Sequence, residues 1–321
     1  MISTSDGKRT IERQFRHAGL TLNSSAWFSW RSLKNMQMFS KYLCLVALSA
    51  LSLRPATVAT AQDNDSVHRV YKMNYWVAGG LCAAAAAGGI FTIPARAKPN
   101  FTDADLLALK TSDVPSYDQW SMRQDPSVVP TYENYSKYLQ IATIAMPLGV
   151  LFDEKIRSDG WNVMLMALEV NAVTVSIYTL TPLGPLFQTR NRPIVYYPNS
   201  PVDRYNGNNK NSFYSGHVAS AAAASFFMAK VFSDYHPEMG ADKYWLYGAA
   251  AIPPLAMAWF RLKALDHFPS DVAVGYVVGT VCGILIPEIH RIGTRDMSFA
   301  PYSSPEGTGL TMRWTTDMSI R

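Results

Sequence analysis

Apolar segments separated by polar stretches are the feature that most constrains how this chain can fold. Several approach the roughly 20 residues that a helix needs to cross a bilayer, and their alanine, glycine and serine content lets helices pack closely. The pattern predicts an all-α helical bundle of six core helices that spans a membrane. A water-soluble helical bundle stays open, because the second segment is short and the third carries Glu169 and Asn171. The six segments cover residues 76–93, 138–152, 161–183, 216–233, 244–260 and 271–289.

The composition also indicates that apolar residues are concentrated in segments. Hydrophobic residues make up 48% of the chain and charged residues only 17%, against about 25% charged in soluble domains, yet the mean hydropathy is −0.02. The net charge of +5 is spread along the chain, which does not favour nucleic-acid binding. The three cysteines and six histidines show no ligand spacing, so we expect no metal site and no cofactor.

The N-terminal region has the pattern of a targeting segment in an unusual position. Residues 36–61 read as a signal peptide or anchor, with flanking lysines, an apolar stretch and small residues at the cleavage positions. Residues 1–35 are polar and are predicted to be a disordered or non-native N-terminal extension. We therefore hypothesise that translation starts at Met36 or Met38 and that the mature protein starts near Gln62.

The rest of the chain divides into three parts. Residues 62–137 contain the first apolar helix and a proline-rich polar loop with at most a short helix near 103–110. The core that carries the chemistry is predicted at 138–290. A polar C-terminal tail, 291–321, follows it and is expected to contain one strand at 310–315.

Three polar clusters flank the apolar segments. Residues 190–193 follow the third segment, and residues 215–217 open the fourth. Arg261 closes the fifth segment, and His267 and Asp271 open the sixth. Because helices joined by short connections run antiparallel, all three clusters are expected at the same end of the bundle.

The residue types in these clusters suit an oxyanion. A helix N-terminus offers free N–H groups and a partial positive charge. Gly216 would let a ligand approach the backbone closely, and Ser215 adds a hydroxyl donor. Arg192 and Arg261, with Arg190 nearby, supply planar forks that match phosphate oxygens.

The histidines suit nucleophilic catalysis. His267 and Asp271 are four residues apart, so the carboxylate is expected to accept one imidazole N–H and leave the other nitrogen as a nucleophile. His217, from another helix, would protonate the leaving oxygen. Simpler explanations exist, since a histidine or aspartate at a helix start is often a cap or dipole partner, and Arg190 and Arg192 could flank a membrane. The joint occurrence of these residues favours an active site.

Over about residues 135–290 the clusters resemble the signature of the type-2 phosphatidic acid phosphatase and vanadium haloperoxidase superfamily. That signature has a lysine, six residues and Arg-Pro, then Pro-Ser-Gly-His, and finally Ser-Arg, five residues, His, three residues and Asp. The matching residues of this chain are Arg192, Pro193, Ser215, Gly216, His217, Arg261, His267 and Asp271.

The resemblance implies a bundle of six core helices, which spans the membrane in the lipid phosphatases of the superfamily, and catalysis without metal or cofactor. It implies that His267 attacks phosphorus, that Asp271 orients it and that His217 protonates the leaving group. The residues implied to hold the phosphoryl oxygens are Arg192, Ser215, Gly216 and Arg261.

Three positions depart from the signature. Pro185 stands in place of the lysine, Tyr214 in place of the proline and Phe260 in place of the serine. Arg190 or Lys210 is predicted to replace the missing lysine as an auxiliary phosphate ligand. Because the nucleophile and the acid are kept, the departures bear on rate and substrate range more than on reaction type.

The sequence therefore predicts a phosphatase that hydrolyses a phosphomonoester or diphosphate on a membrane lipid through a phosphohistidine intermediate. Two alternatives stay open: a vanadate-dependent haloperoxidase, and a catalytically inactive membrane scaffold of the same fold. The expected partners are a phosphorylated lipid or isoprenoid diphosphate substrate and the membrane, without nucleic acid. The expected location is the bacterial cell envelope, as a multi-pass protein with an extracytoplasmic active site.

Overall fold

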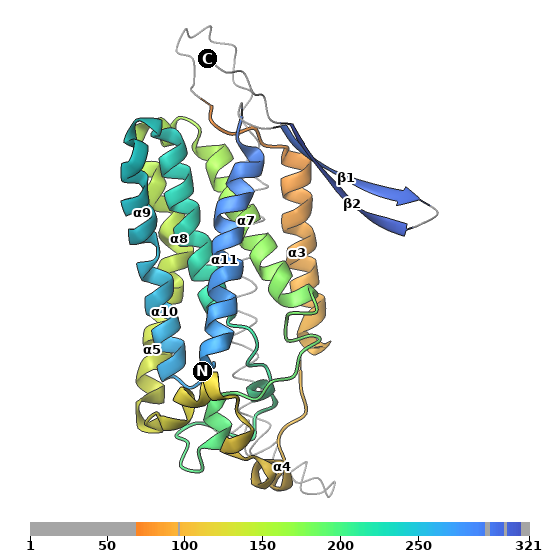
Figure 1. The fold of residues 1–321 in the computed structure, drawn as a ribbon, viewed down its shortest axis with the longest axis vertical. Coiled ribbons are helices and arrows are strands. Elements are labelled where there is room, and N and C mark those ends of the chain that lie inside the picture. The colour runs from red at the N-terminus through yellow and green to blue at the C-terminus, as the bar shows by residue number, and fades with distance from the viewer. Residues whose placement is uncertain (1–68, 96, 293–295, 305–306, 316–321) are drawn as a thin grey trace, which may run out of the picture. The chain divides into compact units, whose positions relative to one another are not determined.

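The computed structural model describes residues 69–95, 97–292, 296–304 and 307–315, so the predictions for 1–61 lie outside the described residues. Within them, helices form a bundle of six rods, which confirms the predicted helical bundle (Figure 1). Two of the rods are composite, because α5 continues into a 3-10 helix and α9 is separated from α10 at Ala251. The rods are α3 (Tyr75–Ala95), α5 (Val129–Ala145) with η4 (Met146–Phe152), α7 (Gly160–Leu180), α8 (Gly216–Tyr235), α9 (Lys243–Ala250) with α10 (Ile252–Lys263), and α11 (Pro269–His290).

Two helix boundaries differ from the prediction, and proline accounts for both. Helix α5 begins at Val129, nine residues before the predicted start at 138, with Pro130 in its first turn, where a missing N–H costs nothing. The fifth apolar segment is interrupted at Ala251 because Pro253 and Pro254 open α10 and cannot donate to the preceding turn of α9.

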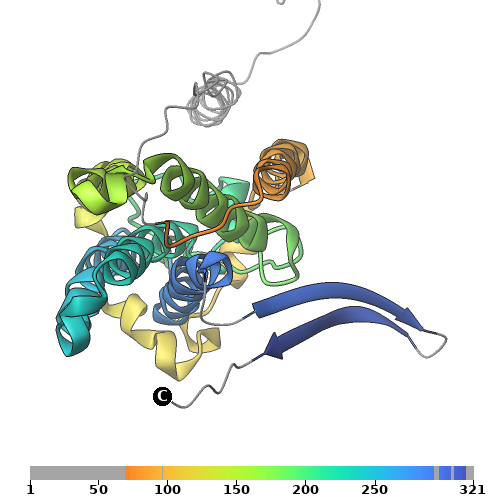
Figure 2. The same ribbon diagram turned by 90° about the horizontal axis from the view of Figure 1, so that it is seen from above.

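Helix α8 is the central element of the bundle. It packs against α5, α7, α9, α10 and α11, while α3 lies on the outer side of α7 (Figure 2). Alanine dominates the first half of α8, so the neighbouring helices can approach it closely. The largest buried apolar cluster lies between α7, α8 and α11 and includes Val163, Met166, Val170, Ala223, Phe227, Val231 and Ile286.

The polar stretch between α3 and α5 is more ordered than predicted. Helix α4 (Asp103–Ala108) lies where a short helix was expected, and a capping box between Thr102 and Asp105 begins it. Short 3-10 helices occupy much of the remainder and the later loops. They are η1 (Thr111–Asp113), η2 (Ser116–Arg123), η3 (Pro126–Val128), η5 (Pro193–Tyr196), η6 (Gly207–Lys210) and η7 (Pro237–Asp242). A four-residue α-helix, α6 (Glu154–Arg157), lies between η4 and α7.

The C-terminal tail contains an antiparallel hairpin of β1 (Asp296–Ser304) and β2 (Gly307–Thr315). The strand predicted at 310–315 lies within β2. Its partner β1 was not predicted, because Pro301 and three serines argue against a strand in sequence.

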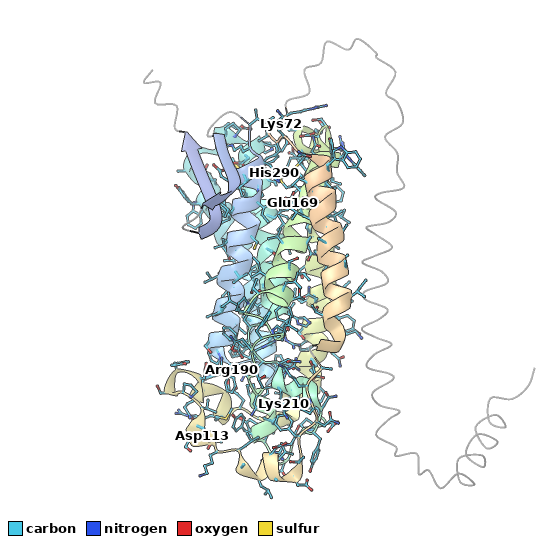
Figure 3. All side chains as sticks on the ribbon, turned by 90° about the vertical axis from the view of Figure 1, so that its right-hand side faces the viewer. Lys72, Asp113, Glu169, Arg190, Lys210 and His290 are labelled. Atoms are coloured by element: carbon cyan, nitrogen blue, oxygen red, sulfur yellow. The ribbon has the colours of Figure 1, made fainter. Side chains whose placement is uncertain are left out.

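A polar network joins the helix ends that lie opposite the clusters. Lys230 of α8 is 2.6 Å from Asp234 and 2.7 Å from Glu288 of α11. Glu169 of α7, whose charge left the membrane prediction open, is buried and lies 3.0 Å from the ring nitrogen of His290. Figure 3 shows Glu169 and His290 near one end of the bundle and Arg190 and Lys210 near the other.

In the described part of the chain, α7 and α11 are the two helices long and apolar enough to cross a membrane. Only 33% and 39% of their apolar windows are buried, so both turn much of their apolar surface outward. The other predicted spans fall short for local reasons. Helix α8 carries Lys230 and Asp234, and the rod of α9 and α10 is broken at Ala251.

Candidate active site

Glycine spacing brings the starts of α8 and α11 together. A Cβ atom on Gly275, Gly279 or Gly283 of α11 would lie 2.4, 2.1 or 2.5 Å from the carbonyl oxygens of successive α8 turns. Those carbonyls belong to Ser215, Ala219 and Ala223. Because residue numbers increase in the same direction along both helices at these contacts, α8 and α11 run parallel, with their backbones in direct contact.

Parallel packing places two helix N-termini side by side. Ser215, the residue before α8, donates its backbone N–H to the carbonyl of Asp271 in the first turn of α11 at 3.1 Å. Each N-terminus presents unpaired N–H groups and a partial positive charge. The combined ends favour an anion more than either helix alone.

His267 lies just before α11 and is 3% exposed at its side chain. Its Nδ1 is 2.6 Å from the backbone carbonyl oxygen of Ser212. Because a carbonyl can only accept, Nδ1 carries the proton and Nε2 keeps the lone pair. The prediction that Asp271 accepts this proton is wrong in its geometry, since the Asp271 carboxylate is 3.9 Å from Nδ1 and engages other donors.

The carboxylate of Asp271 supports the histidine indirectly. One of its oxygens accepts from the Ser212 hydroxyl at 2.6 Å and from the Phe268 N–H at 2.8 Å. Ser212 thus uses its hydroxyl for Asp271 and its carbonyl for His267. Asp271 therefore positions the segment that orients His267.

Arg190, predicted as an auxiliary phosphate ligand, is held by side chains of the protein in this arrangement. Its guanidinium contacts Asp271, Asp118 of η2 and the hydroxyl of Ser270, and lies over the ring of Phe268. Asp118 is fully buried and also accepts from the N–H and hydroxyl of Ser270. The charge of the guanidinium is balanced by two carboxylates, which argues against Arg190 as a replacement for the missing lysine.

Lys210, the other predicted replacement for the lysine, lies beside an aromatic ring. Its ammonium lies 4.4 Å from the ring centre of Phe101, at the start of the segment that carries α4. Its backbone carbonyl accepts from the N–H of Arg190 at 3.0 Å. Through that bond η6 supports the segment that carries Arg190, while the Lys210 ammonium lies over Phe101.

Arg192 and Arg261 meet at one carboxylate. Asp266 contacts Arg192 Nη1 at 2.5 Å and Arg261 Nη2 at 2.8 Å. Arg261 also donates to the hydroxyl of Ser136 of α5 at 3.2 Å. Residues far apart in the chain, from the 190–193 cluster and the end of α10, thus form a single guanidinium pair beside His267.

The two arginines and burial also determine the protonation state of His267. Burial lowers the pKa of His267 well below its usual value, and the charges of Arg261 and Arg192 lower it further. His217 acts in the same direction, whereas the Ser212 carbonyl opposes it. His267 is therefore neutral near pH 7, as a nucleophile requires.

Three predicted phosphate ligands carry buried donors that lack a partner. Within the described part of the chain, Arg192 Nε, Ser215 Oγ and Arg261 Nε are buried and make no hydrogen bond. Buried donors are almost always paired in proteins. Gly216 completes this surface, although Tyr178 packs 3.4 Å from where its Cβ would lie, so its backbone is only partly accessible.

Three residues of the candidate site escaped the sequence reasoning. Asp266 directly precedes His267 in the sequence, and a charged residue next to a predicted nucleophile could have marked it as part of the site. Ser212 lies three residues before Ser215, so its closeness to the 215–217 cluster could have marked it in the same way. Asp118 carries no sequence signal, because its partners are at least 72 residues away.

The comparisons with known proteins bear on the same region. The sequence profile of the PAP2 superfamily matches residues 162–294, which contain both histidines and the guanidinium pair. This part of the chain is similar to the PAP2 superfamily. No curated protein sequence matches the chain significantly.

A solved structure is also similar to this chain. It is described as the first transmembrane PAP2 type phosphatidylglycerolphosphate phosphatase from Bacillus subtilis, with 16% identity and a TM-score of 0.40. The match covers 66% of this chain and 94% of that chain. The described residues contain no group of three or more His, Cys, Asp or Glu side chains that could hold a metal ion.

Proposed function

We propose that this protein is a phosphatase that hydrolyses a phosphomonoester or diphosphate on a membrane lipid, with His267 as the nucleophile. The observation that carries the proposal is the set of buried, unpartnered donors on Arg192, Ser215 and Arg261. They lie at the joined N-termini of α8 and α11, beside a neutral histidine. Donors of this kind match the oxygens of a tetrahedral anion.

The chemistry follows from the fixed tautomer of His267. Nε2 attacks phosphorus and the bond from phosphorus to the leaving oxygen breaks. Burial, Arg261 and Arg192 lower the pKa of His217, so His217 takes up its proton when the anionic phosphate offsets the two arginines, and it then gives that proton to the leaving oxygen. A water molecule then attacks phosphorus and loses a proton to His217, and the P–N bond breaks to release phosphate and neutral His267. The guanidinium pair stabilises the charge on the equatorial oxygens in both steps.

Exposed apolar side chains on the outer faces of the helices support a lipid substrate. Large apolar side chains are exposed on the outer faces of α3, α10 and α11, including Trp76 and Trp259. Trp is enriched where a protein meets the membrane interface, and an exposed apolar surface of this kind marks a membrane or partner contact. A lipid against α10 at Trp259, two residues before Arg261, would present its headgroup at the end of the bundle that carries the site.

Phosphate release from a lipid panel by purified protein in detergent tests the proposal. The panel includes phosphatidic acid, phosphatidylglycerol phosphate, an isoprenoid diphosphate and a lipid A phosphate. Wild type should release phosphate from at least one, His267→Gln should release none, and His236→Gln, a matched change at the far end of α8, should behave as wild type.

A trapping experiment tests the intermediate separately. Radiolabelled substrate quenched in base should leave a base-stable, acid-labile label on the peptide that contains His267. Equal phosphate release by wild type and His267→Gln would exclude His267 as the nucleophile. Absence of release from the whole panel by folded wild type would support the inactive scaffold instead.

A further inference from the structure

We propose that Asp266 is a positioning residue that holds Arg192 and Arg261 with their Nε edges toward the phosphate, and that its charge limits how tightly phosphate is retained. The inference rests on the proposed function, because it takes an oxyanion as the ligand of this site. Nothing in the sequence signature places an acidic residue directly before the nucleophile.

Asp266 contacts one edge of each guanidinium, at an Nη atom, and leaves the edge that contains Nε without a contact from it. Its carboxylate, on a side chain 6% exposed, contacts Nη1 of Arg192 and Nη2 of Arg261. The Nε atoms of both arginines are buried and without a hydrogen-bond partner among the described residues. Because a guanidinium offers five donors in a planar fork, Asp266 can keep its edge while an anion binds the other.

The fold imposes the position of this carboxylate. Leu265 has φ +52°, a left-handed conformation unusual for a side chain of its size, and it is fully buried. Its carbonyl accepts the N–H of Ile194 at 3.1 Å, and the N–H of Asp266 returns to the Arg261 carbonyl at 3.2 Å. Such conformations persist where the surroundings determine them, so the turn aims Asp266 at the arginines.

The charge of Asp266 also affects the affinity for phosphate. Arg190 is already neutralised by Asp118 and Asp271, so the guanidinium pair supplies the positive charge that faces the ligand. The Asp266 carboxylate, in contact with that pair, repels a bound phosphate dianion, and the repulsion is strong because the site is partly shielded from water. Weaker retention favours release of inorganic phosphate, the product of the proposed reaction.

The test is the affinity of purified Asp266→Asn for inorganic phosphate, measured by titration calorimetry in detergent. The amide keeps the shape and one acceptor but removes the charge, so phosphate should bind at least about tenfold more tightly than to wild type. In turnover assays KM should fall, and kcat should fall as well because product leaves more slowly. A merely structural carboxylate would instead weaken binding when replaced.

The matched control is Asp234→Asn, which alters another buried, ion-paired aspartate at the far end of α8. It should lower thermal stability and leave phosphate affinity unchanged. Folded Asp266→Asn that binds phosphate no more tightly than wild type would overturn the inference while leaving the proposed function intact. Wild type that binds no phosphate would overturn both.

A second measurement covers the case in which Asp266→Asn does not fold. A structure of wild type with vanadate should show the anion on the Nε edges, with Asp266 still in contact with both Nη atoms. An anion seated on the Nη atoms, with Asp266 displaced, would refute the holding role.

Discussion

Replacing Gly279 by alanine should disturb the site from a distance, through the contact between α8 and α11. The added Cβ would lie 2.1 Å from the Ala219 carbonyl oxygen and 2.8 Å from the Ala222 Cβ. Neither atom belongs to a flexible side-chain end, so the helices must separate by about 1 Å to restore an ordinary contact.

The magnitude follows from two opposing effects. Overpacking of this kind costs up to about 3 kcal/mol, and alanine in place of a helical glycine recovers about 1 kcal/mol. The net loss of about 2 kcal/mol corresponds to a fall in Tm of roughly 4–8 °C for a domain of this size. Activity should fall by about 10²-fold, because an error of about 1 Å in reacting groups has that effect.

The assay is thermal unfolding followed by tryptophan fluorescence in detergent, together with phosphate release. The matched control is Gly248→Ala of α9, where a Cβ meets nothing within 4 Å. It should raise stability by about 0.5–1 kcal/mol and leave activity unchanged. If Gly279→Ala matches wild type in both Tm and activity, the close parallel contact does not position the site.

Position along the contact gives a finer test of the same reasoning. Gly275 faces Ser215 at the site, whereas Gly283 faces Ala223 two turns further along α8. Alanine at either position should lower Tm by a similar amount, because the clashes are of similar length. The loss of activity should be larger for Gly275→Ala, and the reverse order would contradict the argument.

Three further outcomes follow from the contacts around the histidine. Arg190→Gln should lower stability by about 3 kcal/mol, because it leaves two buried carboxylates unpaired, while Lys210→Gln should change it little; chemical or thermal unfolding in detergent distinguishes them. The pKa of His267 is lower in the folded than in the unfolded protein. Its contribution to stability is therefore complete above about pH 6.5 and is lost as the pH falls below that value. The Tm of His267→Gln should accordingly fall less than that of wild type between about pH 7.5 and pH 5. Ser212→Ala removes the hydroxyl bond to Asp271 but keeps the carbonyl that orients His267, so it should cost about 1 kcal/mol and reduce phosphate release less than His267→Gln does.

Much of the fold was predictable because it depends on local patterns. Continuous apolar stretches produced α3, α7, α8 and α11 close to the predicted bounds. The errors arose where single residues override such a pattern, as with Pro130 at the start of α5 and the proline pair that opens α10. The hairpin partner β1 was missed because its pairing with β2 has no local signal.

The candidate site was predictable only in outline. Antiparallel helices joined by short loops must return to the same end of the bundle, so the gathering of Arg192, Arg261 and both histidines could be argued from residue order alone. The roles within the cluster could not be assigned in that way. Arg190 and Arg192 look equivalent in sequence, yet the first is bound by two carboxylates, whereas the second contacts one carboxylate and keeps a buried Nε without a hydrogen-bond partner.

The order of residues along the chain thus determined which chemical groups meet and at which end of the bundle. Tertiary structure decided which acceptor each donor contacts: Ser212 rather than Asp271 for His267, and Asp266 for the two arginines. The physical reason is that periodicity acts over many residues, whereas a hydrogen bond is made or lost within about 1 Å. That precision comes from the glycine contact between α8 and α11 and the turn at Leu265, both set by packing between distant segments.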